Sequence, residues 1–239
     1  MCGRYASSKS AADLALEFEA SEIGVAAGLP PSYNVAPTDE VYIVAQRPAR
    51  EERPAQRQLR TARWGLVPSW AKERSIGARM INARLETVAD KPAFRKAFAT
   101  RRCLVPADGY FEWYRSESGT KQPFFIHPRD GRSLAMAGLY EFWRDPAAAP
   151  DTPLMWSCTI ITTSATDDLG RLHDRMPLVV EPEDWEDWLG PEPAHPEALV
   201  PAADQHSGLE AWPVSTAVGN VRNNTPELIV PLPATGEGA

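Results

Sequence analysis

Short β-prone segments, separated by turn residues, run through most of the 239-residue chain. Turn signals occur at Asp108-Gly109, Ser118-Gly119 and Asp130-Gly131, each beside residues of high β-propensity. Strands are expected over residues 40–45, 59–67, 101–105, 110–114, 122–127, 134–143, 156–163, 178–180 and 212–214. So many short strands with only a few helices predict an α+β fold.

Three segments carry the signals of short helices. Ser10 and Asp13 resemble the start of one helix. A second helix is expected with Pro92 in its first turn, and a third is expected to open at Pro182. The segment Tyr33–Thr38 is expected to be a turn-rich loop.

The length and composition favour one folded domain. The chain is 43% hydrophobic with eight tryptophans, which is typical of a packed globule. It shows no internal repeat and no composition shift that would mark a domain boundary. We therefore predict a single α+β domain over residues 1–239, with a mostly antiparallel, barrel-like sheet core flanked by a few helices. Its ordered core is expected over about 2–232, followed by a short C-terminal tail.

Cysteine usage and hydropathy predict the compartment. The cysteines at positions 2, 103 and 158 form no spaced pair, which fits a reducing cytosol and predicts neither a disulfide framework nor a zinc site. No apolar run reaches about 18 residues, and no signal peptide is recognisable. We expect a cytoplasmic protein that uses no metal or other cofactor and has no membrane partner.

The charge distribution is uneven. The chain has a net charge of −7, yet residues 53–102 hold thirteen Lys and Arg against three acidic residues. A basic block on an acidic body is what a local phosphate-binding groove needs. A solvated basic loop is the alternative, and it is preferred for Arg53–Arg60, which resembles an exposed hairpin connection.

Cys2 is the second residue, and its small side chain predicts that methionine aminopeptidase removes Met1. Cys2 would then carry a thiol and a free α-amine, a pair that can close a thiazolidine ring on an aldehyde. An α-amine titrates near 7.7–8.0, so roughly a tenth of it is neutral at pH 7. The position of Cys2 by itself favours an ordinary second residue. The rest of the chain decides between that interpretation and a reactive N-terminal cysteine.

Glu112 lies in an unusually aromatic segment, residues 110–114. Alternation puts Glu112 on one face with Tyr110 and Tyr114. A carboxyl among aromatic rings is desolvated, which raises its pKa and makes it a plausible general acid. An outward glutamate on a half-solvated sheet fits the pattern equally well.

Other polar residues have both functional and ordinary explanations. His173, in a polar turn, could shuttle protons, although a lone histidine is more often structural. His127, His195 and His206 are expected at the surface. Asn82 could orient a carbonyl or hydroxyl group, or simply serve a turn.

Two arginines and two tryptophans are candidates for nucleic-acid contact. Arg84 and Arg175 could hold phosphates with their guanidinium forks, or pair with carboxylates. Trp64 and Trp70 could stack on bases, although core packing is preferred for Trp64.

Nine motifs, in order, resemble the SRAP family, the SOS-response-associated peptidases now regarded as abasic-site processing proteins. They are MCGRY (1–5), YNVAPT (33–38), RWGLVPSWA (63–71), INARLET (81–87), RRCLVPADGYFEWY (101–114), AGLYEFW (137–143), TIITTSA (159–165), HDRMPLVV (173–180) and VRNNTPELIVP (221–231). Each motif alone is weak, and together they are highly specific. One departure is Trp70-Ala71, where some relatives have a tryptophan pair.

The resemblance implies a function and assigns site residues. The resemblance implies a bacterial-type member, which recognises abasic sites in single-stranded DNA and crosslinks to them as part of the DNA damage response. It is expected to be associated with the nucleoid when bound to DNA. The implied catalytic residues are Cys2, Asn82, Glu112 and His173. The implied DNA-binding residues are Arg4, Trp70, Arg84 and Arg175. A monomer is expected.

Three other functions remain open. An N-terminal-nucleophile amidohydrolase also begins Met-Cys-Gly, but its glutamine-binding loops are not recognisable here. A thiol peptidase would use Cys2 and His173, although the sequence indicates at most self-processing of Met1. A non-catalytic single-strand binder would use Arg84, Arg175 and Trp70.

Overall fold

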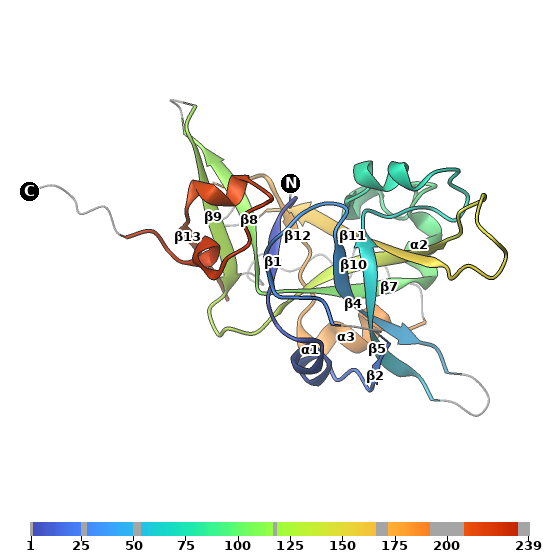
Figure 1. The fold of residues 1–239 in the computed structure, drawn as a ribbon. Helices are drawn as coiled ribbons and strands as arrows, with labels where there is room; N and C mark the ends of the chain where they lie inside the picture. Colours follow the sequence, from blue (N-terminus) through green and yellow to red (C-terminus); the bar gives the residue numbers. More distant parts are fainter. Residues whose placement is uncertain are drawn as a thin grey trace, which may run out of the picture.

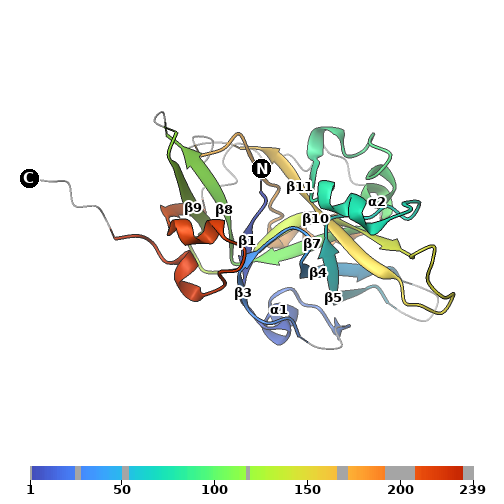
Figure 2. The same ribbon diagram turned by 45° about the horizontal axis from the view of Figure 1, so that its top comes forward.

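The strands of the computed structural model form two sheets that share one core (Figures 1 and 2). The structure describes residues 2–24, 28–49, 54–116, 119–165, 172–191 and 208–233. Within these residues, one sheet has five strands and the other has eight. None of the described helices is long and apolar enough to cross a membrane.

The eight-stranded sheet is ring-like. It comprises β12 (Arg175–Pro177), β11 (Met155–Ser164), β10 (Leu134–Trp143), β7 (Arg102–Ala107), β4 (Glu40–Arg47), β5 (Gln56–Trp64), β2 (Glu22–Ile23) and β6 (Asn82–Arg84). β5 pairs with β11 as well as with β4, so β11, β10, β7, β4 and β5 close on themselves. Only the pairings β11–β5, β11–β6 and β2–β5 are parallel. The predicted α+β fold with a mostly antiparallel sheet core is thereby confirmed.

The five-stranded sheet brings the two ends of the chain together. In spatial order it contains β13 (Leu209–Pro213), β9 (Lys121–Pro128), β8 (Gly109–Arg115), β1 (Tyr5–Ser7) and β3 (Ser32–Val35). The chain passes from β7 in one sheet to β8 in the other at Asp108-Gly109. There, the amide of Asp108 donates to the carbonyl of Ala6 at 2.7 Å. This predicted turn therefore joins two sheets, and β1 lies between β8 and β3.

Three short α-helices cover the ring. They are α1 (Ala11–Glu17), α2 (Arg95–Thr100) and α3 (Trp185–Leu189). The described residues also form 3₁₀ turns: η1 (Arg74–Arg79), η2 (Leu85–Thr87), η4 (Pro182–Asp184), η6 (Thr216–Gly219) and η7 (Pro226–Ile229). Ser10 caps α1 as predicted, because its hydroxyl accepts from the amide of Asp13 at 3.2 Å. The prediction for Pro92 was wrong, since α2 begins three residues later, after a turn.

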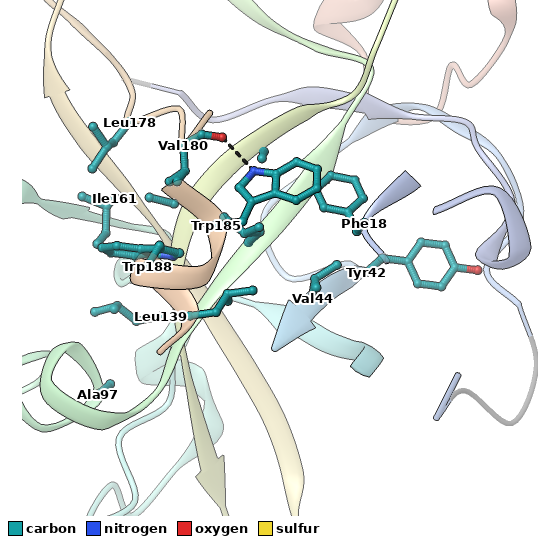
Figure 3. Packing of buried hydrophobic residues seen from close by; sticks show 14 of the residues in the cluster. Phe18, Tyr42, Val44, Ala97, Leu139, Ile161, Leu178, Val180, Trp185 and Trp188 are labelled. Carbon is teal, nitrogen blue, oxygen red and sulfur yellow. Dashed lines mark hydrogen bonds between the residues drawn. The ribbon is translucent and has the colours of Figure 1, made fainter. Parts of the chain in front are cut away.

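The helices pack on the outer face of the ring through aromatic residues (Figure 3). Phe18 stacks on Trp185 with ring centroids 4.7 Å apart. The indole nitrogen of Trp185 donates to the carbonyl of Val180 at 2.9 Å. Trp188 is fully buried, and its indole nitrogen donates to the carbonyl of Cys103 at 2.8 Å. Both indoles thus bury their rings without leaving a donor unpaired.

A second cluster fills the ring and extends to the five-stranded sheet. Its buried members include Cys2, Tyr5, Val35, Ile43, Trp64, Cys103, Val105, Tyr110, Ile126, Met136, Cys158 and Ile160. Trp64 is fully buried, as preferred from the sequence, with its indole nitrogen donating to the carbonyl of Ile81 at 2.9 Å. The second residue of the chain is therefore part of the core.

A third cluster lies on the opposite face of the five-stranded sheet. Residues 214–230, here called the C-terminal strap, cross this face. Val214, Val218 and Leu228 of the strap pack against Ala6 and Phe111. The last described part of the chain thus supports the strand that follows Cys2.

Several sequence-based boundaries differ from the structure. Part of the expected loop at Tyr33–Thr38 forms β3, because β1 offers it a partner. The hairpin connection expected to reach Arg60 ends before Gln56, where β5 begins. β5 pairs with β4 along the whole length of β4. Residues 178–180 make only the single bridge Val179–Met136, and the paired strand is Arg175–Pro177. The predicted turn at Ser118-Gly119 lies partly outside the described residues.

Candidate active site around Cys2

Cys2 lies at the junction of the two sheets with its side chain completely buried. Its carbonyl oxygen accepts a hydrogen bond from Nδ2 of Asn82 at 2.7 Å. Burial raises the pKa of the Cys2 thiol well above its ordinary value, and the charge of Glu112 raises it further. The thiol is therefore protonated at neutral pH.

Glu112 faces the same cluster as Cys2. The side chain is 4% exposed, and its strand neighbour Tyr110 is 1% exposed. Phe111 and Trp113 point to the opposite face, toward the C-terminal strap, as alternation predicts. The inward position of Glu112, left open by the sequence, is thus settled. Desolvation raises the pKa of Glu112, and nearby positive charge, including that of His173, opposes this shift.

Asn82 joins Cys2 to the eight-stranded sheet. It is the first residue of β6 and lies opposite Ile160 of β11. Its Nδ2 binds the Cys2 carbonyl, but its Oδ1 is buried with no hydrogen-bond partner among the described residues. An unpaired buried acceptor costs about 1–3 kcal/mol. A donor on a bound molecule could recover that cost.

His173 has a partner for its Nδ1 in either protonation state. Nδ1 lies 3.0 Å from the backbone nitrogen of Arg175 and 2.9 Å from Oδ1 of Asp174. The first contact requires an unprotonated Nδ1 and the second a protonated one. The ring can therefore gain and lose a proton while keeping a hydrogen bond.

Arg84 and Arg175 flank the end of β11. Arg84 is exposed and lies opposite Thr162, whereas Arg175 lies opposite Ser164. The guanidinium of Arg175 makes a two-pronged ion pair with Glu86, at 2.5 and 3.0 Å. This hydrogen bonding lowers the pKa of Glu86. Carboxylate pairing, the alternative recognised from the sequence, is thus realised for Arg175.

Arg4 points away from Cys2, toward the C-terminal strap. Its Nη1 donates to Oδ1 of Asn34 at 2.7 Å and to the carbonyl of Val218 at 3.0 Å. Partial burial lowers the pKa of Arg4. At least one of its guanidinium nitrogens is therefore engaged within the protein.

Trp70 is 63% exposed on a turn closed by a hydrogen bond from the amide of Ala71 to the carbonyl of Pro68. Lys72, Arg74 and Arg79, which follow along the chain, are also exposed. An exposed indole next to cations is suited to stacking on a base.

The chain is similar to proteins of a known family over most of its length. The family profile described as SOS response associated peptidase (SRAP) matches residues 1–221. The chain belongs to the SRAP family. It is 37% identical over 231 residues to "Abasic site processing protein YoqW" of Bacillus subtilis, covering 96% of this chain and 99% of the relative.

Further relatives of this SRAP chain extend beyond Bacillus. "Abasic site processing protein YedK" of Escherichia coli is 37% identical over 240 residues, covering 97% of this chain and all of the relative. "Abasic site processing protein HMCES" of Gallus gallus is 32% identical over 227 residues, covering 84% of this chain and 66% of the relative. A crystal structure of a Bacteroides thetaiotaomicron protein has a TM-score of 0.79 at 25% identity, covering 97% of this chain and all of that one.

The other three predicted catalytic residues of this SRAP chain, Asn82, Glu112 and His173, are linked to Cys2 by a hydrogen bond or by charge. Asn82 donates a hydrogen bond to the Cys2 carbonyl. The charge of Glu112 raises the pKa of the Cys2 thiol, and the charge of His173 lowers the pKa of Glu112. The sequence placed Tyr110 on the face of Glu112 but not Tyr5, which reaches the thiol because β1 pairs with β8 and sets Tyr5 opposite Tyr110. Sequence reasoning also missed Asn34, which no local pattern distinguishes.

His127 was wrongly expected at the surface of this SRAP chain. Its side chain is only 13% exposed, and its ring lies 4.0 Å from that of Trp212. Burial results from β13, which reaches β9 from far along the sequence. His195 and His206 lie outside the described residues.

A separate cavity of about 500 Å³ lies on another face of the SRAP fold. Its lining combines apolar residues with acidic ones, among them Glu17, Asp130, Glu181 and Glu183. None of the predicted site residues contributes to it. Among the described residues, no three His, Cys, Asp or Glu side chains are grouped to hold a metal ion.

Proposed function

We propose that this SRAP protein processes abasic sites in DNA and does so by forming a covalent crosslink through Cys2. The observation that carries the proposal is the burial of Cys2 beside Glu112, with its carbonyl held by Asn82. The names of the relatives, each an abasic site processing protein, support the same substrate. In this role the protein shields the lesion as part of the response to DNA damage.

The chemistry begins with removal of Met1, which exposes the α-amine of Cys2. The amine attacks C1′ of the ring-opened deoxyribose and forms a carbinolamine. Loss of water gives an imine, and addition of the Cys2 thiol across the C=N bond closes a thiazolidine. The thiol hydrogen ends on the ring nitrogen, so no oxidant or reductant is needed. Ring closure within one residue benefits from effective molarities of about 10⁵–10⁸ M.

The electrostatics of the site support an amine-first order. The raised pKa of Cys2 keeps the thiol neutral, so it is a weak nucleophile until the imine forms beside it. Glu112, whose pKa is raised by desolvation, is suited to protonate the departing hydroxyl of the carbinolamine. As the sulfur adds, it can relay the thiol proton to the ring nitrogen.

Asn82 and His173 have supporting roles in this proposal. The unpaired Oδ1 of Asn82 would accept a hydrogen bond from the adduct. His173 would assist ring opening of the sugar, because its Nδ1 keeps a partner in both protonation states. Neither role requires a metal or another cofactor.

Single-stranded DNA is the proposed partner. Arg84 and Arg175 would contact phosphates beside the site, with Arg175 exchanging Glu86 for a phosphate. Trp70 would stack on a flanking base. Arg4 is the fourth residue that the family resemblance assigns to DNA. We propose a monomer that acts in the cytoplasm at the nucleoid.

A thiol peptidase or an amidohydrolase is less well supported. A Cys–His dyad needs a thiolate, which requires a lowered thiol pKa, whereas burial raises that of Cys2. Peptidase activity is therefore proposed to be limited to self-processing of Met1. Purified protein that releases ammonia from glutamine would favour the amidohydrolase instead.

A denaturing gel tests the function directly. The protein, with Met1 removal checked by intact mass, is mixed with a single-stranded oligonucleotide holding one abasic site. We expect a covalent band that is absent with an undamaged oligonucleotide and with Cys2→Ala. Cys2→Ser should give only a band that needs borohydride trapping, since a serine imine cannot close the sulfur ring. A full-strength stable band from Cys2→Ala would refute the assignment.

A further inference from the structure

Asn34 links three parts of the chain from a buried position in β3. The side chain is 4% exposed, and its Oδ1 accepts from Nη1 of Arg4 at 2.7 Å. Its Nδ2 donates toward three carbonyls of the C-terminal strap. They belong to Asn223 at 2.8 Å, Asn220 at 3.1 Å and Val218 at 3.2 Å. Both ends of the amide are therefore used.

Arg4 closes a triangle with the same residues. Its Nη1 bonds both Asn34 and the carbonyl of Val218, which Asn34 also bonds. Val218 is fully buried against Ala6. The guanidinium of Arg4 is thus fixed by a strap whose own position is set by packing.

The strand that begins directly after Arg4 is short. β1 has only three residues, and its register with β3 is irregular, with Tyr5 opposite Val35 but Ser7 opposite Ser32. The backbone of Arg4 is held to β8, because its carbonyl accepts from the amide of Phe111 at 2.9 Å. The side-chain clamp adds a second tie, to β3 and to the C-terminal strap.

We propose that Asn34 is a positioning residue, which acts through Arg4 and the C-terminal strap to hold Cys2 beside Glu112. Cys2 lies two residues before Arg4, so a shift of Arg4 moves the reacting atoms. A misplacement of about 1 Å can slow a reaction by about 10²-fold. This inference rests on the proposed function of Cys2. It gives Arg4 a role inside the protein beside the DNA contact that the family resemblance assigns to it.

Crosslinking kinetics separate positioning from DNA contact. Asn34→Leu and Arg4→Met should each lower the crosslinking rate at saturating abasic DNA by about tenfold or more, in line with the cost of misplacement. The Kd of Asn34→Leu for an undamaged single strand should stay unchanged. Arg4→Lys should recover part of the rate, because an ammonium can still reach one of the two acceptors. If Arg4 acted only by binding phosphate, Arg4→Met would instead raise the Kd and reduce the salt slope by about one.

Asn224→Ala is the matched control. Asn224 also joins the C-terminal strap to the β3 region, through the amide of Tyr33 at 2.6 Å and the carbonyl of Pro31 at 3.3 Å. These bonds lie outside the triangle that fixes Arg4. We expect its crosslinking rate to match that of the wild type. An equal loss in Asn224→Ala would reduce the role of Asn34 to general support of the strap and overturn the proposal.

Thiol alkylation gives a readout that needs no DNA. Folded protein is treated with iodoacetamide, and each cysteine is followed by peptide mass spectrometry. Asn34→Leu should accelerate alkylation of Cys2 while Cys103 and Cys158, buried inside the ring, stay protected. Equal acceleration of all three, or of none, would contradict the inference. If the wild type formed no crosslink, the proposed function would be refuted. The alkylation assay would still show whether Asn34 holds Cys2 in place.

Discussion

Glu112 shows how one buried residue sets both chemistry and stability. Its carboxyl is 4% exposed among aromatic side chains, and desolvation raises its pKa. The unfolded chain, in contrast, has an ordinary glutamate that titrates near 4.3. The folded state therefore holds this proton to higher pH than the unfolded state does. A site that stores a proton in this way is suited to donate it to a departing hydroxyl.

The raised pKa of Glu112 also predicts how stability depends on pH. Because the folded pKa lies above the unfolded one, the free energy of unfolding falls as pH rises through the window between them. Glu112→Gln removes this loss, so its advantage in Tm over the wild type should grow across the window and then level off. Thermal scans from pH 4 to 8 measure it, and an advantage that shrinks with pH would contradict the buried charge.

At the scale of elements, the end of β11 brings cations to the site from two sides. β6 pairs with β11 in parallel and delivers Arg84, and β12 pairs antiparallel and delivers Arg175. Arg175 is paired with Glu86, which follows β6, whereas Arg84 is exposed. The two arginines are therefore not equivalent toward DNA, since one must first exchange a carboxylate.

This difference predicts opposite effects on DNA binding. Arg84→Ala should weaken binding of single strands and reduce the slope of log K against log salt by about one. Glu86→Gln should tighten binding, because it removes a negative charge and releases Arg175. Fluorescence anisotropy at several salt concentrations measures both. Arg144→Ala serves as control, since Arg144 is exposed and bonds carbonyls of its own loop. Unchanged slopes in both test variants would show that DNA does not contact Arg84 or Arg175 at the end of β11.

At the scale of the whole molecule, the two sheets do not form separate cores. The cluster inside the ring includes Tyr5, Val35, Tyr110 and Ile126 from the five-stranded sheet. The first strand is also tied to the C-terminal strap through Arg4 and Val218. The candidate site lies at this junction, so it exists only when both sheets are folded.

A single cooperative transition is therefore expected. Calorimetry should give one peak whose calorimetric and van't Hoff enthalpies agree, and near-UV and far-UV circular dichroism should change together. Crosslinking activity should be lost in the same transition. Two resolved peaks would show that the sheets unfold independently, contrary to the shared core.

Sequence alone predicted the features that depend on neighbours along the chain. The cap of α1 at Ser10, the bounds of β10 and the shared face of Tyr110 and Glu112 follow from local hydrogen bonding and from the two-residue period of a strand. The α+β class follows from the same local signals. The family resemblance, now confirmed, rests on motifs that can be read without any contact information.

Only the tertiary structure decided which residues meet across the chain. It placed β1 between β8 and β3, turned Arg4 toward Val218, paired Arg175 with Glu86, and buried His127 under β13. Local periodicity carries no information about partners so far apart. Arg4 and Val218, for example, are separated by 214 positions. Whether a polar side chain meets a partner, solvent or substrate is settled by packing, because burial and long-range pairing determine the energy of that choice.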